Sequence, residues 1–117
     1  MAEFNTSIKN QGAVRIINLK GYLDAHTAPI LENNFVDLIE KSCYQIVVDF
    51  KDLAYISSAG LGVFMAYIEK IRDSKGDIKL SGMSDKVYNI FDLLGFPLLY
   101  EIFKSEDEAV KKFTEIK

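Results

Sequence analysis

Residues Leu53-Ala54-Tyr55-Ile56-Ser57-Ser58-Ala59-Gly60-Leu61-Gly62-Val63-Phe64-Met65 decide the fold of this 117-residue chain. The apolar run just before them, 45–50, predicts a buried strand. After the serines, large apolar side chains recur at helical spacing and predict a helix over 60–74. Ser57 and Ser58 therefore lie where the chain passes from a strand to a helix.

Two explanations fit this pair of hydroxyls. Serine is a favoured N-cap, because its oxygen accepts a hydrogen bond from a backbone N–H that has no partner within the helix. A helix N-terminus also carries partial positive charge, so it accommodates a phosphate ester. The small residues Ala59 and Gly60 leave the first helical turn approachable. Ser57 and Ser58 are thus either a helix cap or a phosphorylation site.

The composition is that of an ordinary globular domain, with 49% hydrophobic and 26% charged residues. The length predicts a single domain over 1–117. A net charge of −3 gives no electrostatic reason to expect nucleic acid. The sequence has no basic amphipathic stretch, no apolar run of roughly 20 residues and no signal peptide at its start. We therefore expect a cytoplasmic protein that binds neither nucleic acid nor a membrane.

Strand and helix signals alternate along the chain and predict the order β-β-α-β-α-β-α-β-α. This order is typical of an α/β fold, here with about five strands in a mostly parallel or mixed sheet and four helices packed on it. The expected strands cover 4–10, 13–20, 45–50, 77–81 and 98–103; the expected helices cover 28–41, 60–74, the residues from Ser84 to the stop at Gly95, and the residues after Ser105.

Local signals add further expectations. Gln11-Gly12 predicts a hairpin turn, Gly21-Tyr22-Leu23-Asp24 a strand end or bulge, and Thr27 a helix N-cap. We expect Leu94 and Ile116 to face inward from their helices, and Asp49 and Asp52 to be surface charges.

Residues for familiar catalytic or metal chemistry are sparse. His26 is the single histidine, so we expect no metal site, and Gly60-Leu61-Gly62 lacks the further glycine and lysine of a phosphate loop. Ser58, His26 and Asp24 suggest a hydrolase triad on paper. However, the residues around Ser58 do not match a nucleophile elbow, and so small a domain offers little room for a substrate pocket. We expect no enzyme and no cofactor, and keep a small serine hydrolase as the alternative of another class.

Asp24 is the acidic residue most readily placed near the serines. It follows the strand at 13–20, and the serines follow the strand at 45–50. Functional groups gather at the carboxyl ends of parallel strands, so Asp24 approaches the serines if these strands are neighbours. The carboxylate then either orients a hydroxyl toward a γ-phosphate or only caps a turn.

Two motifs resemble the STAS domain family, which includes the bacterial anti-sigma-factor antagonists. The first is Gly21-Tyr22-Leu23-Asp24-Ala25-His26-Thr27-Ala28, which is similar to the Gly-x-Leu-Asp segment before the family's first helix. The second is Asp49-Phe50-x-x-Leu53-x-x-Ile56-Ser57-Ser58-Ala59-Gly60-Leu61-Gly62, which is similar to the family's phosphorylation segment. The resemblance covers nearly the whole chain and implies the STAS fold.

The resemblance implies a phosphorylation switch between protein partners. The unmodified domain would bind an anti-sigma factor that is also a serine kinase with a histidine-kinase-like ATPase fold, and so free the sigma factor. Phosphorylation would release the domain, and a PP2C-type phosphatase would reset it. The motif puts the phosphoacceptor at Ser58, with Ser57, where many members have Asp, as the second choice.

The same resemblance places other residues around the switch. Asp24, Ser57, Ala59 and Gly60 would lie near the phosphate. The partner would contact Tyr22, His26, Thr27, Ile56, Leu61 and Gly62. The alternative within the fold is a STAS interaction module in another signalling, secretion or transport complex that involves no sigma factor.

Overall fold

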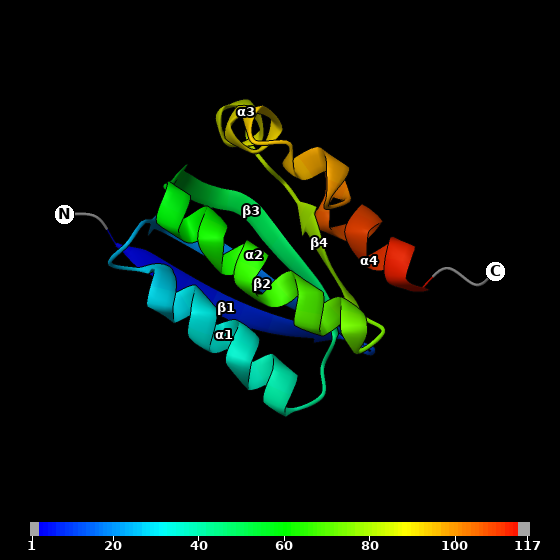
Figure 1. Ribbon diagram of the computed structural model, residues 1–117. Helices are drawn as coiled ribbons and strands as arrows, with labels where there is room; N and C mark the ends of the chain where they lie inside the picture. Colours follow the sequence, from blue (N-terminus) through cyan, green and yellow to red (C-terminus); the bar gives the residue numbers. More distant parts are fainter. Residues whose placement is uncertain (1–2, 115–117) are drawn as a thin grey trace.

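The computed structural model describes residues 3–114 and shows a five-stranded sheet with helices on both faces (Figure 1). The strands are β1 (Phe4–Gln11), β2 (Val14–Leu23), β3 (Gln45–Ile56), β4 (Asp77–Ser81) and β5 (Ile102–Phe103). The helices are α1 (Ala28–Glu40), α2 (Ser58–Asp73), α3 (Asp85–Leu93) and α4 (Glu106–Thr114), with a 3-10 turn, η1 (Phe96–Leu98), before β5. The predicted order and the mixed α/β sheet are confirmed.

The strands lie in sequence order, β1-β2-β3-β4-β5, with β1 antiparallel to β2 and the remaining pairs parallel. Alternate side chains of β3 enter two separate cores. Ile46 and Val48 belong to the larger core, which α1, α2 and α3 cover, and Val47 belongs to a smaller one beneath α4. A central strand buried on both faces explains the unbroken apolar run at 45–50. No helix of residues 3–114 has the length and apolarity to cross a bilayer.

Strand β3 continues to Ile56, six residues beyond the predicted end at 50. Lys51 and Asp52 break the apolar run but do not end the strand, because β3 bulges there. Asn18 and Lys20 of β2 pair with Asp49 and Asp52, so β3 uses three residue steps where β2 uses two. A second extra step follows between Leu53 and Tyr55. The bulges therefore lie in β3. The segment 21–24 was predicted to be either a strand end or a bulge, and it is where β2 ends.

The end of the chain departs furthest from the predictions. The strand expected over 98–103 is much shorter: a 3-10 turn occupies Phe96–Leu98, where the fixed backbone angle of Pro97 favours it, and only Ile102 and Phe103 pair with β4. Leu94 is 57% exposed rather than inward, because Phe96 packs edge-on against Phe91 with ring centroids 5.1 Å apart. The expectation for Ile116 lies outside the described residues.

Asp49 is buried, which corrects its assignment as a surface charge; Asp52 is exposed, as expected. The Ser81 hydroxyl donates to Asp49 Oδ1 at 2.9 Å, and the Asn18 amide donates to Oδ2 at 3.3 Å. The same Asn18 amide donates to Glu106 Oε1 at 3.1 Å. These bonds link the start of α4 to β2 and, through Asp49, to β3 and β4, and they compensate for burying a carboxylate.

The Glu106 carboxylate makes stability depend on pH. Burial opposes its ionised form, but the Lys9 ammonium at 2.8 Å and the Asn18 amide outweigh burial and hold the pKa of Glu106 below its ordinary 4.5. A lowered pKa stabilises the fold above that value, and the contribution is lost as pH falls through the folded pKa. In urea denaturation, the wild-type midpoint should therefore fall more steeply than that of Glu106→Gln between about pH 5 and pH 3. If the midpoints of the wild type and Glu106→Gln fell in parallel over this pH range, Glu106 would not be the cause of the pH dependence.

Candidate functional site

The parallel pairing of β2 and β3 brings Asp24 and the serines to one edge of the sheet. Leu23 pairs with Ile56, and the Ser57 N–H donates to the Leu23 carbonyl at 2.9 Å. Asp24 and Ser57 directly follow these paired residues. The two strands are thus neighbours, the condition on which the placement of Asp24 near Ser58 depended.

Ser57 occupies the N-cap position of α2 but does not cap it with its side chain. Its backbone is extended, with φ −103° and ψ 174°, and its carbonyl accepts the Leu61 N–H at 3.1 Å. The Oγ atom is shielded from solvent and has no hydrogen-bond partner among the described residues. A shielded hydroxyl is a poor target for an enzyme, because the turn has to open before another active site reaches it.

Ser58 is the first residue of α2, and it is exposed, as is Ala59 beside it. The first N–H groups of a helix have no partner within it, so they and the helix dipole favour negative charge at this position. The shielded Ser57 hydroxyl and the exposed Ser58 are thus on consecutive residues. An incoming enzyme therefore reaches Ser58 with no change in the turn.

Gly60 seats the first turn of α2 on the sheet. It is buried, and an added Cβ would lie 2.7 Å from Leu23 Cγ and 3.1 Å from Ile56 Cγ1. Leu23 is itself fully buried, so moving it aside would disturb the core packed around it. Gly62 differs in both respects, because it is exposed and a Cβ there meets nothing within 4 Å. The fold requires the first glycine and not the second.

These two glycines make a matched pair of stability tests. Gly60→Ala should destabilise the domain by about 1–3 kcal/mol, the usual cost of overpacking a buried contact. Gly62→Ala should stabilise it by about 0.5–1 kcal/mol, because alanine favours an exposed helical position over glycine. Chemical denaturation of both variants measures the two signs. A stabilised Gly60→Ala would show that the first turn of α2 is free to lift from Leu23.

The Asp24 carboxylate holds the loop that joins β2 to α1. Its Oδ1 atom accepts the backbone N–H groups of His26 at 3.0 Å and Thr27 at 3.2 Å. The Thr27 hydroxyl accepts the Asp24 N–H and donates to the Tyr22 carbonyl, both at 2.8 Å. Thr27 is thus at the predicted N-cap position of α1 but closes the loop instead of capping the helix with its side chain. Asp24 bonds the backbone of His26 and not its ring, so the residues of the imagined triad are not linked as a triad requires.

The predicted contact residues divide by exposure. Ile56 and Leu61 are only 2% and 5% exposed, so the structure corrects their assignment to a contact surface: they support the turn from beneath. Tyr22 is 45% exposed. Its partner across the strands, Tyr55, is 40% exposed, and no motif in the sequence pointed to a role for it. Their ring centroids lie 5.9 Å apart. Strand alternation predicts an outward Tyr55 once β3 is known to reach Ile56.

Exposed groups therefore surround Ser58 on a well-supported turn. The exposed members of the site are Tyr22, His26, Tyr55, Ser58, Ala59 and Gly62. Among residues 3–114, no three His, Cys, Asp or Glu side chains are grouped so that they could hold a metal ion. The arrangement presents a serine on the first helical turn with exposed side chains on the same edge of the sheet.

Comparison with known proteins gives consistent results. The chain is 27% identical over 107 residues to the anti-sigma-B factor antagonist of Bacillus subtilis, covering 92% of this chain and 97% of the relative. Among solved structures, an anti-sigma factor antagonist from Mycobacterium paratuberculosis superposes with a TM-score of 0.89 at 20% identity, over 97% of this chain and 96% of that one.

SpoIIAA, an anti-sigma factor antagonist, is similar in its unphosphorylated form, with a TM-score of 0.84 at 20% identity over 97% of this chain and 99% of that one. Its phosphorylated form, from Bacillus, gives a TM-score of 0.74 at 19% identity over 93% of this chain and 99% of that one. At these identities the structural matches establish the fold. The STAS domain family matches residues 5–109, which is most of the sequence. The chain therefore belongs to the STAS domain family.

Proposed function

We propose that this protein is an anti-sigma-factor antagonist, switched by phosphorylation of Ser58. In the unmodified state it binds an anti-sigma factor, and the sigma factor is released. The observation that carries the proposal is the exposed Ser58 hydroxyl on the first turn of α2, in a chain whose relatives bear this name. The protein acts as a binding partner in the cytoplasm and catalyses no reaction itself.

The partner in this proposal is an anti-sigma factor with a histidine-kinase-like ATPase fold that is also a serine kinase. Ser58 Oγ attacks the γ-phosphorus of the partner's ATP, the bond from that phosphorus to ADP breaks, and the hydroxyl proton passes to a base. A PP2C-type phosphatase hydrolyses the phosphoserine and restores the binding form. Exposure favours Ser58 over Ser57, because Ser58 is exposed whereas the Ser57 Oγ atom is shielded from solvent.

Asp24 has a positioning role in this proposal. Its hydrogen bonds fix the 22–28 loop at the strand end next to the serines. That loop and the exposed side of the first turn of α2 then form one surface, which presents His26 and Gly62 as well as Ser58. The partner meets this surface when the hydroxyl is free and is repelled from it when the hydroxyl carries a phosphate.

A pull-down from the host's lysate with two baits, Ser58→Ala and Ser58→Asp, tests the function. We expect an ATPase-type serine kinase to be captured by the alanine bait and depleted with the aspartate bait. If both baits capture the same proteins, the domain is an interaction module of another complex. Labelling of the wild type by a fluorophosphonate, abolished in Ser58→Ala, would instead support a serine hydrolase.

A further inference from the structure

The segment that joins α3 to β5 exposes four leucines. Leu93 is 85% exposed, Leu94 57%, Leu98 91% and Leu99 45%; we call these residues the leucine shelf. A single exposed leucine is ordinary on a protein surface, but four exposed leucines within seven residues are unusual, and concentrated apolar exposure of this kind is typical of an interaction site.

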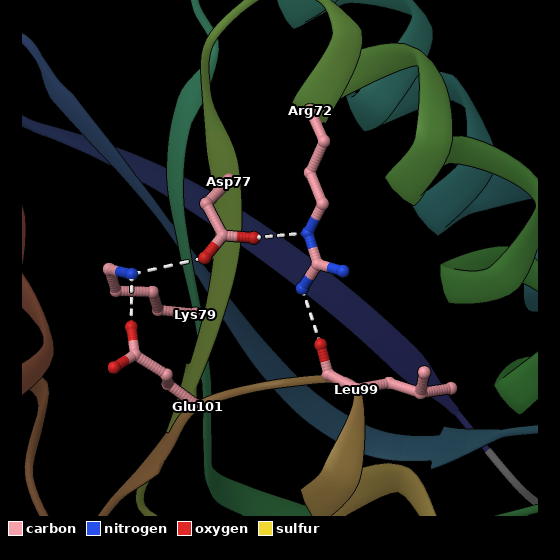
Figure 2. A network of polar contacts seen from close by, with 5 residues as sticks. All are labelled: Arg72, Asp77, Lys79, Leu99 and Glu101. Carbon is pink, nitrogen blue, oxygen red and sulfur yellow. Dashed lines mark hydrogen bonds and ion pairs between the residues drawn. The ribbon is translucent and has the colours of Figure 1, made fainter.

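The leucine shelf is firmly held by the residues between and after its leucines. Phe96 and Tyr100 are buried, and their rings stack at 5.5 Å with an 11° angle between planes. Arg72 of α2 donates to the Leu99 carbonyl (Figure 2). The Arg72 guanidinium also lies 5.6 Å from the centre of the Tyr100 ring. The exposure of the leucines is therefore a property of a fixed segment, so an incoming surface loses little entropy in ordering it.

Charges beside the leucine shelf neutralise one another. Figure 2 shows Asp77 between Arg72 at 2.9 Å and Lys79 at 3.0 Å, with Glu101 on the far side of Lys79. These two cations and two anions line or adjoin a groove of about 510 Å³ whose other walls include Leu98 and Leu99. Arg72 and Lys79 are each paired with a carboxylate and the whole chain carries −3, so these residues give the groove no positive field that would attract a phosphate or an anionic membrane. The chemistry fits an apolar protein surface.

Helix α2 connects the leucine shelf to Ser58. Ser58, Gly62, Met65, Glu69 and Arg72 are exposed and follow the spacing of one helical stripe. From Ser58 to Arg72 this stripe is about 21 Å long, at about 1.5 Å per residue. A standard interface buries about 800 Å² on each partner, a patch roughly 30 Å across. An interface placed along this stripe, with Ser58 toward one end, therefore extends to Arg72, whose side chain contacts the Leu99 carbonyl of the leucine shelf.

We infer that the anti-sigma factor which reads Ser58 also covers the leucine shelf with an apolar surface of its own. This inference rests on the proposed function. It divides the interface into two parts: Ser58 decides whether the partner stays, and the leucine shelf supplies affinity that phosphorylation does not alter.

The test uses the double variant Leu93→Ser/Leu98→Ser and the purified kinase partner identified with the Ser58→Ala bait. Both leucines are almost fully exposed, so the unfolding midpoint should not change. Calorimetry should show binding at least tenfold weaker than that of the wild type. Ile8→Ser is the matched control: Ile8 is 41% exposed on β1, at the far edge of the sheet, and this variant should bind as the wild type does.

The outcomes separate the inference from the function. If Ser58→Asp loses the partner while the double variant binds with wild-type affinity, the leucine shelf is not part of the interface and the switch stands. If the wild type binds no such kinase, both fail. Sedimentation tests whether a second copy of this chain binds the leucine shelf instead. If the wild type is a dimer, the double variant is a monomer and the affinity for the kinase partner is unchanged, the inference is wrong and the leucine shelf is a dimer interface.

Discussion

Phosphorylation of Ser58 should weaken binding of the anti-sigma partner at least a hundredfold, a loss of about 2.8 kcal/mol. A phosphate ester adds about −1.5 to −2 charges at neutral pH. At the first turn of α2 the free N–H groups and the dipole stabilise that charge by about 0.3–1 kcal/mol in the isolated domain. The same charge, dehydrated beneath a docked partner, lacks a matching cation. The fold should therefore persist while the interface fails.

Calorimetry with unmodified and phosphorylated protein measures the effect on binding, and amide chemical shifts measure the effect on the fold. We expect shift changes confined to the first turn of α2 and the 22–28 loop. Ser57→Ala is the matched control: it removes a shielded hydroxyl that has no hydrogen-bond partner within residues 3–114, so phosphorylation and binding should be unchanged and stability should not fall. Equal affinity of the two forms for the partner would rule out Ser58 as the switch.

Gly21→Ala should be the most damaging small substitution in the sheet, at about 2–4 kcal/mol. Gly21 has φ +100°, which side-chain-bearing residues rarely adopt, and an added Cβ would overlap the Glu3 carbonyl. That carbonyl accepts the Tyr22 N–H at 2.8 Å, so moving it away also costs a hydrogen bond. The effect is large against a total stability of about 5–15 kcal/mol.

Urea denaturation followed by circular dichroism measures this loss. Gly12→Ala separates its two causes: Gly12 also has positive φ, +62°, but a Cβ there meets nothing within 4 Å. We expect about 1–2 kcal/mol from the backbone conformation alone at Gly12. If the two alanines cost the same, contact with Glu3 contributes nothing at Gly21.

Local periodicity predicted the fold well wherever each element followed one pattern. The run at 45–50 and the helical spacing after Ser58 placed β3 and α2 next to each other, as observed. Prediction failed where distant groups decide the outcome. Asp49 is buried because Ser81, 32 residues away, supplies a hydrogen bond that no local pattern reveals. Leu94 is displaced outward by Phe96, whose position depends on a turn that the spacing of apolar residues does not specify.

The candidate site was predictable in its location but not in its fine structure. The motif put the serines and Asp24 at the same edge of the sheet, and the pairing of Leu23 with Ile56 realises that arrangement. Which hydroxyl faces outward depends on the backbone angles at Ser57, which is extended, and at Ser58, which is the first helical residue. Sequence does not encode these angles as a recognisable pattern, so only the structure separates shielded Ser57 from open Ser58.

The close seating of Gly60 on Leu23 and Ile56 bears on how long a signal lasts. Because this turn packs so closely on the sheet, we expect modification to leave its conformation unchanged. In the proposed switch, information is then stored in a covalent bond rather than in a shape. Its lifetime is that of the phosphoserine ester, set by the phosphatase, and the domain itself contributes neither a delay nor a spontaneous reset.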